Sequence, residues 1–147
     1  MTNKYLLAWL IPLLLLGASC KKQENPIQEE ISKDIRKADF IGVWTPFKIE
    51  TTFTDKQNQE VSIIDSTEKV KFYIPAYKFT YDKVIVDHNG WDYSVNTLGK
   101  TKTLEYLRYG VLQDYEILKL NASQLILKDI NIEDTGKRVE IVYFNKN

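Results

Sequence analysis

Histidine and cysteine each occur only once in this sequence, which removes several kinds of site at the outset. Because Cys20 is the only thiol, no disulfide can form within the chain, and its stability must come from packing. Because His88 is the only imidazole, metal sites that need two histidines are excluded. A Ser-His-Asp relay would have to be built around His88 alone.

A net charge is also lacking, since 20 basic and 20 acidic residues cancel. No field therefore exists to attract nucleic acid, and we expect no nucleic-acid partner. The chain has no glycine-rich phosphate loop, no nucleophile elbow and no zinc-binding helix motif. The paired carboxylates Glu29-Glu30 and Glu133-Asp134 fall in a tether or in predicted loops, where nothing raises the pKa of one carboxyl above that of the other. No general acid and base pair is therefore indicated. The sequence thus predicts neither an enzyme nor a cofactor.

Potential metal ligands gather around one predicted turn, where Asp87, His88 and Asp92 flank Asn89-Gly90. A hairpin could bring the three side chains together. A turn tip, however, offers no further hydrogen bonds to hold them in a ligand geometry. We therefore expect a solvated turn and no metal site.

The beginning of the chain has the three parts of a secretory signal. Lys4 precedes an apolar run from Tyr5 to Leu16, which is broken only by Pro12, and the small residues Gly17-Ala18-Ser19 follow. The apolar run is shorter than the roughly 20 residues that a transmembrane helix needs. We therefore predict an export signal that is removed, and not a membrane span.

Cys20 directly follows Ala18-Ser19, and this order resembles the lipobox of bacterial lipoproteins. The resemblance implies that residues 1–19 are a signal peptide, that the Cys20 sulfur receives diacylglycerol, and that the new amino group is acylated with a fatty acid such as palmitate. Several acyl chains, at about 0.8 kcal/mol per buried CH₂, make such an anchor effectively permanent. The resemblance therefore implies a lipoprotein of the cell envelope, attached to the outer membrane on its periplasmic or its surface face.

A polar, charged segment, residues 20–38, follows the lipobox and is predicted to be a tether. Its apolar residues Ile27, Ile31 and Ile35 recur every four positions. This spacing predicts a short amphipathic helix from about Ile27 to Lys37, docking on the domain, but a flexible spacer explains the composition equally well.

Residues 39–147 are predicted to form an all-β domain, because helical spacing gives way to alternation of apolar and polar residues. We expect eight to ten short strands in an antiparallel meander. Groups expected to share one face of a strand are Val70, Phe72 and Ile74; Tyr77, Phe79 and Tyr81; Leu125 and Leu127; and Val139, Ile141 and Tyr143.

Turn residues separate the expected strands. Asn89-Gly90 is the strongest signal, since both residues tolerate the positive φ that a type I′ turn demands. Between Asp114 and Asn121 the apolar face switches at Ile117 and Leu118, which predicts a β-bulge. The other expected turns are Leu98-Gly99-Lys100, Asn121-Ala122-Ser123 and Asp134-Thr135-Gly136.

A meander must protect its edge strands, either by closing into a barrel or by folding into a two-sheet β-sandwich. Three segments resemble the lipocalin-like domains of Bacteroidota lipoproteins: Phe40-Ile41-Gly42-Val43-Trp44, the run from Tyr115 to Leu127, and Ile141-Val142-Tyr143-Phe144. The resemblance implies a small eight-stranded up-and-down barrel, with one open end that can take a small apolar molecule.

The same resemblance assigns structural roles at the closed end of the barrel, where Gly42 and Trp44 would close it. In lipocalins a basic residue of the last strand stacks over this tryptophan. An even-numbered meander returns its last strand to the end where the first began, so the partner of Trp44 is expected near Lys146 and not at Arg138.

Aromatic residues in the middle strands are the candidate ligand-binding side chains: Trp91, Tyr93 and Tyr106. Such rings suit an apolar pocket or a contact surface, and equally a plain core. Two functions stay open. One is an envelope lipoprotein that binds a small hydrophobic ligand, and the other is a solid barrel that engages another envelope protein as an inhibitor, immunity factor or assembly factor.

Overall fold

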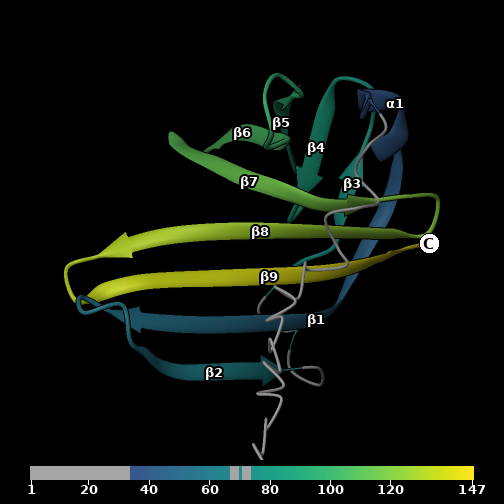
Figure 1. Ribbon diagram of the computed structural model, residues 1–147. Coiled ribbons are helices and arrows are strands. Elements are labelled where there is room, and N and C mark those ends of the chain that lie inside the picture. The colour runs from purple at the N-terminus through teal and green to yellow at the C-terminus, as the bar shows by residue number, and fades with distance from the viewer. Residues whose placement is uncertain (1–33, 67–69, 71–73) are drawn as a thin grey trace, which may run out of the picture.

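The computed structural model describes residues 34–66, 70 and 74–147 (Figure 1). The predicted signal peptide, Cys20 and the tether up to residue 33 lie outside these residues. Within the described ranges, no helix has the length and apolar character needed to cross a membrane.

The domain is almost entirely β, as the alternation predicts. In the described part of the chain the elements are α1 Lys37–Phe40, β1 Gly42–Asp55, β2 Glu60–Ser66, β3 Tyr77–Phe79, β4 Lys83–Val86, β5 Asn89–Asn96, β6 Thr103–Arg108, β7 Val111–Leu120, β8 Gln124–Glu133 and β9 Gly136–Lys146. Nine strands fall within the expected eight to ten.

The sheet closes on itself, because β9 pairs with β1 as well as with β8. Eight strands, β1 and β3 to β9, form the barrel, and β2 is an additional strand. Closure confirms the barrel and excludes the sandwich. At the seam Trp44 of β1 lies opposite Tyr77 of β3 on one side and Lys146 of β9 on the other.

Strand β1 has 14 residues and is much longer than its barrel neighbour β3. One edge of β1 is therefore shared: Gly42–Trp44 pair with β3, and Ile49–Thr54 pair with β2. Strand β2 thus covers an edge that the barrel itself leaves open, which protects β1 from pairing with other chains.

The helix α1 closes one end of the barrel (Figure 1). The backbone N–H of Arg36 donates to Asp39 Oδ2 at 2.8 Å, and this bond holds the first turn. Phe40 is fully buried, with its ring 5.1 Å from that of Phe79 and 6.3 Å from that of Tyr93. Phe40, the first residue of the segment Phe40-Ile41-Gly42-Val43-Trp44, therefore lies in α1 and not in a strand, because its ring packs into the end of the barrel.

Side chains fill the interior next to α1. They come from alternate positions of the barrel strands, which is the pattern that a closed barrel imposes. The buried cluster consists of Phe40, Trp44, Tyr77, Phe79, Val84, Val86, Tyr93, Leu104, Tyr106, Ile117, Leu125, Leu127, Val142 and Phe144.

The opposite end of the barrel is split between β7 and β8. These strands pair only where Glu116–Leu120 lie beside Leu125–Lys128. Beyond that point, among the described residues, Val111–Tyr115 pair only with β6, and Asp129–Glu133 pair only with β9. Figure 1 shows β7 and β8 diverging away from α1, so we call this the open end.

The bulge predicted at Ile117 and Leu118 is confirmed by a register shift between Ile117 and Lys119. The turn predicted at Asn89-Gly90 is wrong by two residues. Asp87 and His88 form it with φ of 51° and 67°, and Asn89 and Gly90 belong to β5. Asp and His tolerate this backbone region better than most residues, and the Asn89 side chain donates to the Asp87 carbonyl.

Two other local predictions are wrong, and a third is tested only in part. Val70 is helical and its carbonyl accepts a hydrogen bond from the Ile74 N–H, so these two residues do not share a strand face, and Phe72 lies outside the described residues. Tyr81 lies in a turn and is 65% exposed, so it shares no strand face with Tyr77 and Phe79. Residues 34–36, the first described part of the expected helix over 27–37, are not helical, and the rest of that helix lies mostly outside the described residues.

Candidate functional site

The closed end is built around Trp44. Its indole Nε1–H donates to the Phe40 carbonyl at 2.6 Å, and its ring is fully buried. The Lys146 ammonium lies 5.0 Å from the ring centroid, where the even-numbered meander predicts the basic partner. Gly42 leaves room for it, because a Cβ there would lie 2.6 Å from Lys146 Cε. This end is therefore sealed by contacts that leave no space for a ligand beside Trp44.

Tyr93 and Tyr106, two of the candidate ligand-binding residues, belong to the buried cluster. The Tyr93 hydroxyl donates toward the Thr80 carbonyl at 3.0 Å, and the Tyr106 hydroxyl donates to the Tyr77 hydroxyl at 3.2 Å. Burial raises the pKa of Tyr93 to about 12 and also raises the pKa of Tyr106. Both hydroxyls therefore stay neutral. Tyr93 packs against Phe40 at the α1 end, whereas Tyr106 lies in the floor beneath the open end, next to Trp91.

Trp91, the third candidate, is only partly buried and packs on the edge of this floor. Its ring lies 6.4 Å from that of Tyr106 and 5.4 Å from that of Tyr109. The Arg108 guanidinium lies 5.7 Å from the Trp91 ring, and its Nη2 lies 2.7 Å from Asp87 Oδ2. The structure thus brings Trp91 and Tyr106 together, with a tethered arginine above them.

The inner face of β9 carries charged side chains near the open end, as the alternation along this strand indicates. Val142 is buried and marks the inner face, so Glu140 and Arg138 face the same way. The Arg138 guanidinium lies 3.4 Å from Glu133 and 3.7 Å from Glu140. The inner surface of β9 therefore changes from apolar to ionic toward the open end.

The strands on either side of the split repeat this change. On β8, Leu127 is buried, and the next inner positions are Asp129 and Asn131, which are joined by a 2.8 Å hydrogen bond. On β7, the Tyr115 hydroxyl donates to Gln113 Oε1 at 3.2 Å. The open end thus combines an aromatic floor with polar walls, a surface typical of sites for amphipathic small molecules.

The potential metal ligands at the β4–β5 turn do not converge. Asp87 is bound to Arg108, and Asp92 is bound to Lys83 at 3.0 Å. Among the described residues, no group of three His, Cys, Asp or Glu side chains is arranged to hold a metal ion.

The sequence analysis missed Arg108, Tyr115 and Gln113 as members of this surface. Alternation along the strands could have identified these three residues, because each lies two positions from an inward-facing residue of the same strand. It was obscured because the hairpin at Tyr109-Gly110, whose φ values are 51° and 81°, was not recognised. Without that turn, the register between β6 and β7 could not be assigned.

Comparisons with models of protein families, with curated proteins and with solved structures find no match for this chain.

Proposed function

We propose that this chain is a lipid-anchored envelope protein whose barrel binds a small, largely apolar molecule at its open end. The proposal combines two parts, an acylated Cys20 and a ligand site over Trp91 and Tyr106. It is the function that the resemblance to lipocalin-like domains implies, with the ligand at the open end of the barrel.

The observation that carries the proposal is the contrast between the two ends. The α1 end is filled by interlocking rings. At the other end the wall splits between β7 and β8 and exposes the edge of an aromatic floor. A flat ring such as Trp91 contributes a large contact area to an apolar ligand, and polar walls fix the orientation of a polar end group.

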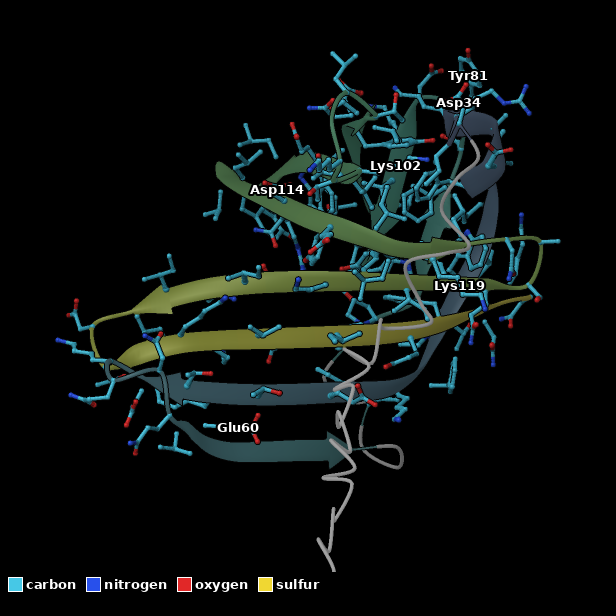
Figure 2. The ribbon with its side chains drawn as sticks, viewed as in Figure 1. Asp34, Glu60, Tyr81, Lys102, Asp114 and Lys119 are labelled. Atoms are coloured by element: carbon cyan, nitrogen blue, oxygen red, sulfur yellow. The ribbon has the colours of Figure 1, made fainter. Side chains whose placement is uncertain are left out.

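The position of the chain start supports the same arrangement. Asp34, the first described residue, lies at the α1 end (Figure 2). Strand β1 begins next to α1, curves through 14 residues and ends on the side of the barrel where β7 and β8 have diverged (Figure 1). A tether that enters at α1 therefore leaves the open end directed away from the anchoring point.

The test is to purify the full chain from the membranes of the cells that produce it, and to extract and quantify bound small molecules by mass spectrometry. We expect one compound or compound class in near-stoichiometric amount with the wild type. Trp91→Ala should lower its recovery about tenfold, because this ring supplies much of the apolar contact.

Tyr81→Ala is the matched control, since Tyr81 is an exposed aromatic residue at the α1 end (Figure 2). Its bound compound should equal that of the wild type. If the wild type carries no compound, or if both variants lose it equally, the proposed site is rejected.

A further inference from the structure

The outer face of β5, β6 and β7 carries a second surface, on the opposite side of the sheet from Tyr106. Leu107 and Leu112 lie opposite each other on neighbouring strands and are 56% and 61% exposed. They form part of a shallow groove of about 320 Å³. The groove is lined on this face by Asp92, Ser94, Glu105, Leu107 and Leu112, and the strand positions of Tyr93 and Tyr106, whose side chains are buried on the inner face, lie between them.

Glu105 of β6 lines this groove, and Asp114 of β7 stands directly opposite it on the neighbouring strand. Like charges in such a cross-strand position destabilise a sheet. Glu105 accepts a hydrogen bond from the Thr103 hydroxyl at 2.9 Å, and no ion pair with either carboxylate is found among the described residues. Partial burial, and then the charges of Glu105 and Asp129, raise the pKa of Asp114.

Neighbouring acidic residues on the same outer face do have cations. Asp92 is 3.0 Å from Lys83, and Glu116 is 2.6 Å from Lys128. Within the part of the chain that the structure describes, the Glu105 and Asp114 pair is therefore a negative site with no paired cation, beside two exposed leucines. Figure 2 shows Asp114 on the half of β7 that points away from Lys119 and toward the open end.

We propose that this groove is a docking surface for a lysine- or arginine-bearing extended segment of a partner protein. A long basic side chain fits both features at once. Its aliphatic stem covers apolar surface such as Leu107 and Leu112, and its charged head binds carboxylates such as Glu105 and Asp114. The surface faces outward, so this inference does not depend on a ligand at the open end.

The test uses a fluorescein-labelled peptide of alternating leucine and lysine, titrated against the full chain in non-ionic detergent and followed by fluorescence anisotropy. The double variant Glu105→Gln with Asp114→Asn should weaken binding about tenfold, because both acceptors for the cation lose their charge. Leu112→Ser should weaken it by about threefold or more through the lost apolar contact.

The control is Asp82→Asn with Asp134→Asn, which removes the same charge from two exposed turns. Its affinity should stay within about twofold of the wild type. Equal weakening by both double variants would mean general charge attraction, and no binding by the wild type would reject the surface.

Thermal unfolding of the free protein is an independent readout. Because the opposed carboxylates repel each other, Glu105→Gln should raise the Tm by about 1–4 °C while it weakens peptide binding. If Glu105 serves to bind a partner, its replacement should increase stability and decrease affinity. A fall in Tm would show that Glu105 is a structural residue, and it would overturn the proposal.

Discussion

Three buried tyrosine hydroxyls make this domain sensitive to alkaline pH. Tyr77, Tyr93 and Tyr106 all lie in the interior, and for each of them burial is the largest cause of a raised pKa. Ionising any of these hydroxyls would place a charge in an apolar interior, which strongly favours the neutral form. The core is therefore expected to lose stability in alkali.

We expect the free energy of unfolding to fall as the pH rises from about 10 to about 12. Unfolded tyrosine loses its proton near pH 10, whereas folded Tyr93 keeps it until about pH 12, so alkali favours the unfolded state across this window. Urea unfolding at pH 9 and pH 11 measures the effect. Tyr93→Phe should lose less stability between these two pH values, and Tyr109→Phe, a change at a residue 71% exposed, should behave as the wild type.

Gly42 is a second residue whose role can be isolated. It has a φ of +138°, and a Cβ there would meet the Lys146 side chain over Trp44. Gly42→Ala should therefore cost about 1–3 kcal/mol of unfolding free energy. Gly99→Ala is the comparison, because Gly99 has a φ of +98° but no heavy atom within 4 Å of the added Cβ. Should the two variants lose equal stability, the contact with Lys146 has no structural importance.

At the scale of elements, α1 matters more than its four residues indicate. It places Phe40 against Phe79 and Tyr93 and provides the carbonyl that binds Trp44. The α1 end of the barrel is closed by this single turn.

Phe40→Ala should cost about 3–5 kcal/mol, because it leaves a cavity in a packed interior. It should also allow an apolar dye such as anilinonaphthalene sulfonate to bind under native conditions. Ile41→Ala changes the adjacent residue, which is 43% exposed, and should cost less than about 1 kcal/mol. Equal unfolding energies for the two variants would contradict the role of α1 as a plug.

The strands could be predicted from the sequence where alternation runs over several residues, as in β8 and β9. The bulge at Ile117 and Leu118 could also be predicted, because an extra residue in a strand moves the apolar side chains to the other face. The position of Lys146 over Trp44 followed from topology alone, since an even number of strands fixes which ends meet.

Short elements could not be predicted in the same way. Asp87-His88 and Tyr109-Gly110 form turns with positive φ, although the sequence pattern favours other turns or none. Contacts between distant residues, such as Asp87 with Arg108, stabilise these turns, and the local sequence does not show them. The helical turn at Phe40 depends on the barrel end that it fills. Arg108, Gln113 and Tyr115 could not be assigned to the open-end surface either, because their assignment requires the β6–β7 register, which depends on the Tyr109-Gly110 turn.

At the scale of the whole molecule, the two ends of the barrel differ. The end beside α1 is sealed and is where the described chain begins, and the other end is split and lined by aromatic and ionic side chains. We propose that the first faces the membrane anchor at Cys20 and that the second faces the ligand. Anchor and binding site are then separated by the length of the barrel.

Native mass spectrometry of the full-length gene product, purified from the membranes of the cells that make it, tests this account most directly. The account predicts one species that begins at Cys20, carries covalent acyl groups on that residue, and holds one small molecule that leaves on denaturation. A chain that retains residues 1–19 without acyl groups, or an acylated chain with no bound molecule, would contradict it.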